Sequence, residues 1–269
     1  MTTEQLPSLV LFSDIPGGEV LGWAGVRQPG ELVFQAEPAR PQVAQAILGW
    51  FLEQAGGDDL AVEVNDADDP MLAVLLRAGF REWAAPGPVY GMFRTRLGPA
   101  PSPPTGYQVR AVRPEETPQR VAVHRAAWDA SSLPWPAEHR PAPEDLGPPL
   151  SFEQALDREE GVRRTWLYDM DFDLVAVANT GEFVGCCIVW LDPDTGVAEI
   201  EPLGVVPEHR RRGLAVALCH EAVSRVAQAG GCEVFINTGP RLAYPVPAAA
   251  YVKAGFGVVT RGRAYLLHR

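Results

Sequence analysis

The chain has 269 residues, 46% of them hydrophobic and 21% charged, which suffices for one large globular domain or two of ordinary size. Its 23 basic and 34 acidic residues give a formal net charge of −11 at pH 7. That balance argues against nucleic acid or an anionic membrane surface as the main partner. The longest apolar run, residues 183–191, is too short to cross a bilayer, so we expect no membrane-spanning segment.

The four cysteines are Cys186, Cys187, Cys219 and Cys232, and no two of them form a C-x-x-C pair. They lie in apolar stretches, where a cysteine usually serves as a small hydrophobic residue. We therefore expect structural thiols and no metal site. The N-terminus also lacks a basic region followed by an apolar one, so we expect a cytoplasmic protein without a signal peptide.

The first half of the chain alternates strands and helices. Val43, Ile47 and Phe51 share one helical face, which predicts a helix over 41–54 that Gly56 and Gly57 end. A second, short helix is predicted over 70–78. Strands are expected at 8–12, 20–26, 31–35, 60–64, 81–84 and 89–97.

Residues 98–106 hold four prolines between two glycines, a composition that forms neither helix nor central strand. This stretch predicts a stiff linker. We therefore expect domains at 1–97 and 107–269, joined by the linker 98–106.

The second half repeats the alternation with longer elements. Ser151 and Gln154 form a capping-box pattern at the start of a helix over 151–160. Residues 131–150 hold six prolines and predict an irregular loop. Further helices are expected at about 114–130, 211–229 and 248–254, and strands at 107–112, 174–178, 183–191, 197–206, 233–237, 257–260 and 264–268.

The two halves share one order of elements, which indicates an internal duplication. Each has strands, a long helix ending in Gly-Gly, a strand, a short helix ending in Ala-Gly-Phe, and two closing strands. Ala78-Gly79-Phe80 thus corresponds to Ala254-Gly255-Phe256. The first copy is shorter, and we expect it to lack the opening strand and two helices.

The most informative stretch is 198–216, where an apolar strand ends at Val206 and a loop opens a long helix. The first backbone N–H groups of a helix have no partner, and its dipole is positive there. Gly213 and the small Ala215 let an anion approach the backbone, while Arg210, Arg211 and Arg212 add charge. The loop therefore predicts a pyrophosphate site.

The second half resembles the GNAT superfamily of acetyl-CoA-dependent N-acetyltransferases. The matching residues are Arg210-x-x-Gly213-x-Ala215, preceded by Leu203-x-Val205-x-Pro207 and followed by Asn237 and Tyr251-x-x-x-Gly255-Phe256. The resemblance covers about 107–269, and the whole chain is similar to tandem GNAT proteins. It implies an α/β fold with two GNAT-like domains, each a mostly antiparallel, splayed sheet flanked by helices.

The resemblance also implies site residues. Backbone groups of Leu203 and Val205 would pair with the pantetheine arm of acetyl-CoA, and the Val205 N–H would polarise the acetyl carbonyl. Backbone amides from Arg210 to Ala215, Leu214 included, would hold the pyrophosphate. Tyr251 would protonate the leaving thiolate, and Asn237 would contact the cofactor near the splayed strands, where Pro202 is expected to form a bulge.

Glu199 and Glu201 are the candidate general bases, and either one, or a water chain, can serve. Both have the same strand parity as Leu203, so we expect them on its side. The family's substrate-facing region corresponds to Trp128, Trp135 and His139 here. Ordinary packing is an equally good explanation of the tryptophans.

The first copy departs from the pattern. Its loop, residues 37–44, has no glycine, Pro41 removes an N–H, and Leu75 occupies the place of Tyr251. We expect no cofactor or catalysis there, hence one cofactor per chain in a monomer or homodimer. The expected reaction is direct acetyl transfer to a primary amine of a small molecule. A non-catalytic CoA-binding module, a peptide N-acetyltransferase and a longer acyl donor, with room at Gly204, are the alternatives.

Overall fold

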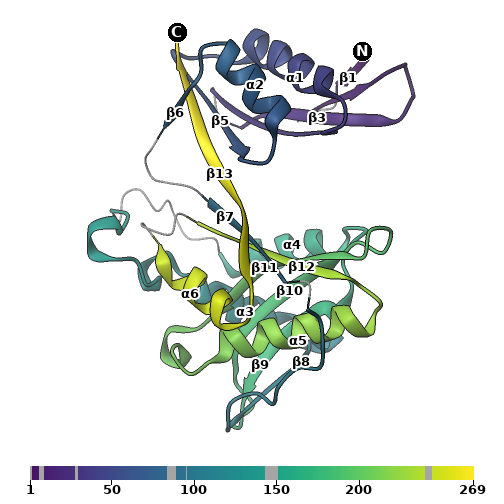
Figure 1. Cartoon of the computed structure of the whole chain (residues 1–269). Helices are drawn as coiled ribbons and strands as arrows, with labels where there is room; N and C mark the ends of the chain where they lie inside the picture. Colours follow the sequence, from purple (N-terminus) through teal and green to yellow (C-terminus); the bar gives the residue numbers. More distant parts are fainter. Residues whose placement is uncertain are drawn as a thin grey trace. The chain divides into compact units, whose positions relative to one another are not determined.

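The computed structural model describes residues 2–5, 9–27, 30–83, 89–94, 96–142, 151–239 and 244–269. They form two compact units (Figure 1). Unit 1 comprises Met1–Val89 and Thr260–Arg269, and unit 2 comprises Tyr90–Val259. Among the described residues, no helix is long and apolar enough to span a membrane.

Unit 1 is a sheet with two helices. Strands β1 to β4 pair antiparallel in sequence order, β4 pairs parallel with β5, and β13 adds antiparallel to β5. The short β6 pairs with β13. The apolar face of α1 packs on this sheet, as its spacing predicts. The bounds are β1 Thr2–Gln5, β2 Val10–Ser13, β3 Val20–Val26, β4 Glu31–Ala36, α1 Pro41–Gln54, β5 Asp59–Asn65, α2 Asp69–Arg77, β6 Arg81–Trp83 and β13 Gly257–His268.

Unit 2 has the sheet order β8-β9-β10-β11-β12-β7, in which only β11 and β12 run parallel. Helices α3 and α4 cover one face, the α3 face, and α5 covers the other, the α5 face. The bounds are β7 Val89–Arg94, β8 Tyr107–Ala111, α3 Thr117–Ala127, α4 Phe152–Arg163, β9 Asp173–Ala178, β10 Phe183–Leu191, β11 Val197–Val205, α5 Leu214–Gln228, β12 Glu233–Thr238 and α6 Pro245–Lys253.

The closing strands of the two copies are exchanged. Strand β7 ends the first half of the sequence, yet it pairs with β12 in unit 2. Strand β13 ends the second half, yet residues 262–268 pair with β5 in unit 1. Figure 1 shows this exchange in its colours, with blue β7 beside green β12 and yellow β13 beside blue β5. The compact units therefore differ from the linear division at 98–106.

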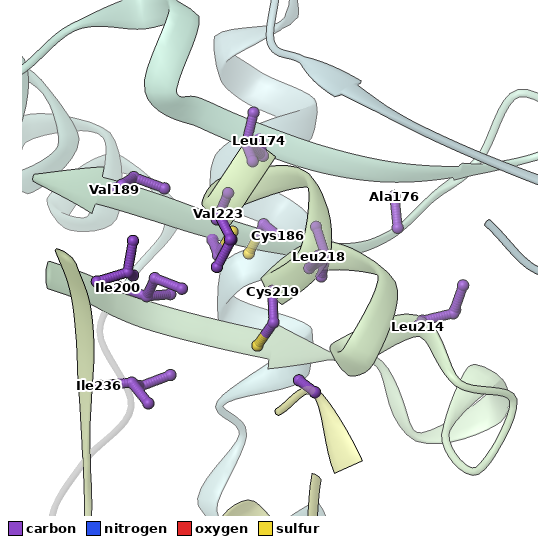
Figure 2. Packing of buried hydrophobic residues seen from close by; sticks show 14 of the residues in the cluster. Leu174, Ala176, Cys186, Val189, Ile200, Leu214, Leu218, Cys219, Val223 and Ile236 are labelled. Atoms are coloured by element: carbon purple, nitrogen blue, oxygen red, sulfur yellow. The ribbon is translucent and has the colours of Figure 1, made fainter. Parts of the chain in front are cut away.

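The core of unit 2 occupies both faces of the sheet, and a large part of it lies between α5 and the sheet. Figure 2 shows Leu218, Cys219 and Val223 of the helix among apolar side chains of β9, β10, β11 and β12. Burial raises the pKa of Cys186 to about 11 and that of Cys219 to about 12, and Cys187 is equally enclosed. These three cysteines are hydrophobic core residues as predicted, but Cys232 is exposed.

Several local expectations need correction. The first copy has an opening strand after all, because β1 pairs with β2 as β8 pairs with β9. Helix α5 begins at Leu214, not at 211, since residues 207–213 form a 3₁₀ turn and a loop. Residues 257–268 form one strand instead of two. The capping box of α4 is confirmed, with Gln154 N–H donating to Ser151 Oγ at 3.1 Å.

Candidate active site

The loop between β11 and α5 presents an uncapped helix N-terminus. Gly213 is the N-cap residue with φ +84°, and no side chain caps the helix. Arg211 also has a left-handed backbone, with φ +64°. Right- and left-handed residues that alternate in this way turn successive N–H groups toward a common side, a geometry that suits an anion. The stretch from Arg211 to Ala215 is therefore built like a phosphate-binding loop.

The side chain of Arg210 does not face this loop. Its Nε donates to the Val205 carbonyl at 3.0 Å and its Nη2 to the Ala127 carbonyl at 3.2 Å, while Nη1 donates to the Ser132 carbonyl. Its backbone N–H donates to Pro207 O. Arg210 thus ties the end of β11 to the end of α3, which differs from the expectation that its guanidinium adds charge to the anion site.

Arg211 and Arg212 remain at the loop surface, and both are exposed. Arg212 Nη1 donates to the Tyr107 hydroxyl at 2.9 Å, and that hydroxyl also lies 2.9 Å from His209 Nδ1. Two arginines beside free helix amides make this loop a local positive site in an acidic chain.

Strands β11 and β12 separate next to the loop. Their parallel pairing ends at Glu199 and Phe235, although β11 continues to Val205. The Val206 N–H donates to Val184 of β10 at 3.0 Å, so the alternating N–H groups of Leu203 and Val205 point to the opposite edge. Because that edge is where β12 has diverged, it can accept an extended ligand.

A bulge in β11 changes which face each side chain occupies. Cys187 lies opposite Leu203 and Val189 opposite Ile200, so three steps of β11 match two of β10. The extra residue falls at Glu201 and Pro202, as expected from the proline. Because opposite residues share a face, Leu203 follows Cys187 to the α5 face, whereas Glu199 follows Trp190 to the α3 face. The expectation that Glu199 shares the side of Leu203 is wrong.

Both candidate bases have perturbed carboxyl groups. Partial burial raises the pKa of Glu199, and a hydrogen bond from Asn237 Nδ2 to Glu199 Oε1, at 3.1 Å, opposes that rise. Burial also raises the pKa of Glu201, and the charge of Glu199 raises it further. A raised pKa suits a carboxylate that takes a proton from an amine. Asn237 therefore contacts Glu199. The sequence had predicted a contact between Asn237 and the cofactor, and not this one.

Tyr251 lies in the last turn of α6 and is 7% exposed. Burial raises the pKa of its phenol well above the usual value, and nearby Cys219 and Glu201 raise it further. The phenol therefore stays protonated at neutral pH and can donate a proton. The structure thus brings Tyr251 within electrostatic reach of Glu201 on β11.

Trp128 follows α3 and covers Gly204. A Cβ added at Gly204 would lie 2.8 Å from Ala127 Cβ and 2.9 Å from Trp128 Nε1. The absence of a side chain at 204 is what lets the indole approach β11. Gly204 consequently leaves no spare room for a longer acyl chain on the α3 face.

Trp135 stacks on Tyr244, with ring centroids 4.4 Å apart. Burial raises the pKa of Tyr244, and its charged form would interact with Tyr251. Sequence reasoning missed Tyr244, although it precedes Tyr251 by seven residues, or two helical turns. His139 ends a 3₁₀ helix, and its side chain lies outside the described part of the structure.

Comparisons with known proteins agree with this geometry. A model of the acetyltransferase (GNAT) family matches residues 122–256, from the middle of α3 to just past the end of α6. A comparison with curated protein sequences finds no match. Among the described residues there is also no group of three or more potential metal ligands.

Solved structures share the fold over nearly the whole chain. A GCN5-related N-acetyltransferase from Sphaerobacter thermophilus is 22% identical, with 97% of this chain and 80% of that chain covered and a TM-score of 0.60. A tandem GNAT protein of the clavulanic acid biosynthesis pathway is 16% identical, with 97% and 84% covered and a TM-score of 0.60. An acetyltransferase of the GNAT family from Colwellia psychrerythraea is 13% identical, with 97% and 85% covered and a TM-score of 0.63.

Proposed function

Because the chain belongs to the GNAT acetyltransferase family, whose general reaction is acetyl-CoA-dependent acetyl transfer, we propose that it acetylates a primary amine of a small molecule by direct transfer. The observation that carries the proposal is the conjunction, in unit 2 alone, of an uncapped α5 N-terminus, a splayed β11 edge and a buried, protonated Tyr251.

The residues of unit 2 fit acetyl-CoA. The N–H groups from Arg211 to Ala215 would hold its pyrophosphate, and the free edge of β11 at Leu203 and Val205 would pair with its extended arm. Bound there, acetyl-CoA supplies an activated thioester. The corresponding loop of unit 1 has no residue with a left-handed backbone, and Pro41 removes one N–H, which supports one cofactor per chain.

Side chains of β11 and α6 would accept and donate the protons that the reaction moves. The carboxylate of Glu199 or Glu201 accepts the proton that the amine loses as its nitrogen bonds to the carbonyl carbon. The Val205 N–H donates to the carbonyl oxygen as negative charge develops there. Tyr251 gives its proton to the sulfur when the carbon–sulfur bond breaks. The transfer therefore yields an amide and a free thiol without a covalent enzyme intermediate.

The acceptor side supports a cationic amine. Trp128 at Gly204, the stacked Trp135 and Tyr244, and the carboxylates of Glu199 and Glu201 all belong to unit 2. Aromatic faces and carboxylates attract ammonium groups, and a carboxylate also removes the proton that makes such a group unreactive.

The test is thiol release from acetyl-CoA with a panel of small amines, comparing the native chain with Tyr251→Phe. Tyr251→Phe should lower kcat about 10²–10⁴-fold and leave CoA affinity nearly unchanged, since a proton donor contributes on this order. Tyr265→Phe, at a buried tyrosine of unit 1, is the matched control and should change neither.

Three outcomes would contradict the proposal. Tight CoA binding without turnover on any amine would make unit 2 a binding module. Turnover only with N-terminal peptides would make it a peptide acetyltransferase. Full activity of Tyr251→Phe would remove the phenol from the mechanism.

A further inference from the structure

We infer that Arg94, which the first half of the sequence supplies through β7, is a positioning residue for Tyr251. The inference rests on the proposed role of Tyr251 as the proton donor. Arg94 Nη1 donates to the Ala254 carbonyl at 2.7 Å, and Arg94 Nε donates to the Arg96 carbonyl at 3.1 Å. The guanidinium is thus fixed at the C-terminus of α6, the helix that carries Tyr251.

The end of α6 is a Schellman motif that includes the tyrosine itself. The Phe256 N–H donates to the Tyr251 carbonyl at 3.0 Å, and the Gly255 N–H donates to the Val252 carbonyl at 3.0 Å. These bonds occupy two of the last carbonyls and leave that of Ala254, the C-cap residue. Arg94 donates to that carbonyl, which the His220 side chain also contacts, and the positive charge of Arg94 complements the helix dipole.

Gly255 lies directly against the guanidinium of Arg94. A Cβ at Gly255, where φ is +91°, would lie 3.5 Å from both Cζ and Nε of Arg94. The guanidinium therefore lies against the backbone of the last turn. Since α6 has only nine residues, its orientation depends on contacts at its two ends more than on its own hydrogen bonds.

A helix held at its last turn holds the Cα–Cβ direction of Tyr251. The Tyr251 ring packs beside Phe256, with ring centroids 6.5 Å apart. A shift of the last turn of α6 would therefore move both rings. A proton donor misplaced by about 1 Å loses much of its effect on the rate, even when the fold survives. Arg94 consequently acts on kcat through Tyr251 without touching the acetyl donor.

The equivalent contact in unit 1 is apolar. Arg94 pairs with Val234 near the start of β12, and Leu267 pairs with Leu60 near the start of β5. The Cβ of a residue at Gly79, the counterpart of Gly255, would meet Leu267 Cδ1 at 3.6 Å. The arginine thus occurs only at the copy whose short helix carries a tyrosine.

The test is a double-mutant cycle with Arg94→Leu and Tyr251→Phe in the full chain, measured as kcat, KM for acetyl-CoA and melting temperature. Arg94→Leu should lower kcat about tenfold and change KM less than twofold. Arg94→Lys should recover part of the loss, because an ammonium can still donate to the Ala254 carbonyl. In the Tyr251→Phe background, Arg94→Leu should have no further effect on kcat.

Leu267→Ala, which removes the equivalent contact in unit 1, should lower the melting temperature and leave kcat unchanged. If Arg94→Leu keeps the native kcat, or loses the same tenfold in the Tyr251→Phe background, the positioning role of Arg94 is wrong. Either result would leave the proposed role of Tyr251 untouched. Full activity of Tyr251→Phe would overturn the proposed proton donor and this inference with it. If Arg94→Leu fails to fold, the cycle with Arg94→Lys decides by the same criterion.

Discussion

The two units share the order long helix, strand, short helix, but the loops that open their long helices differ in backbone conformation. In unit 1 the Glu37 carboxylate accepts the Ala39 N–H at 3.1 Å, and α1 begins with Pro41, which has no N–H to offer. Neither α1 nor α5 has a side-chain cap, but in unit 2 the corresponding loop has two left-handed residues, Arg211 and Gly213. A few loop residues, and not the sheet, therefore distinguish the proposed phosphate site of unit 2 from the turn of unit 1.

The short helices of the two units end alike but carry different chemistry. The Phe80 N–H donates to the Leu75 carbonyl at 3.1 Å, as Phe256 does to Tyr251, and Gly79 and Gly255 both have φ +91°. The same motif therefore presents leucine in one copy and tyrosine in the other. What differs is the side chain in the last turn and the strand residue that packs on the glycine.

The largest expected difference between the units concerns glutamates whose pKa values are raised. Replacing the general base, by Glu199→Gln or Glu201→Gln, should lower kcat/KM at neutral pH about 10²–10⁴-fold. Because burial raises both pKa values, the acid limb of the native kcat/KM profile should lie above the ordinary range of glutamate. Glu63→Gln in β5 of unit 1, where burial also raises the pKa, is the control and should change nothing.

Asn237→Ala separates the two candidates. Losing the hydrogen bond that lowers the pKa of Glu199 raises that pKa, so the acid limb should move to higher pH if Glu199 is the base. A limb that stays in place while Glu201→Gln abolishes turnover would assign the role to Glu201. Native profiles in both glutamine variants would leave no role for either carboxyl.

The next largest expected effect is on CoA affinity at the loop around Gly213. Gly213→Asp should weaken CoA binding about 100-fold, or about 2.7 kcal/mol, because aspartate tolerates a positive φ and places a negative charge beside the helix amides. Isothermal titration should report one CoA per native chain. Gly57→Asp, at φ +93° in unit 1, should keep native affinity. Undiminished affinity of the Gly213 variant would move the phosphates to another place.

The smallest expected effect concerns the glycines that end the short helices α2 and α6. Gly79→Ala and Gly255→Ala should each lower the free energy of unfolding by about 1–2 kcal/mol, because a left-handed backbone strains any L-residue with a Cβ. The neighbours at 3.5–3.6 Å add only ordinary contacts. Denaturant unfolding measures the loss, and only Gly255→Ala should also reduce kcat. Equal activity in both variants would show that the end of α6 does not need its native geometry.

Local sequence determined most elements of this protein. The apolar spacing of 41–54 and the apolar run 183–191 predicted α1 and β10 with their observed bounds, because each pattern is complete within its own segment. The glycine and arginines of 210–215 predicted an anion-binding helix N-terminus for the same reason. The family resemblance rested on these residues too.

Only the tertiary structure decided which residues meet in the site. The strand patterns of β7 and β13 suit any sheet edge, so nothing local shows that each pairs in the other unit and that Arg94 reaches α6. A single extra residue in β11 reversed the parity that placed Glu199. Arg210 turned inward because the Ala127 and Ser132 carbonyls, from a distant segment, converge on it together with the nearby Val205 carbonyl. Each of these outcomes depends on partners remote in sequence, which alternation and spacing cannot encode.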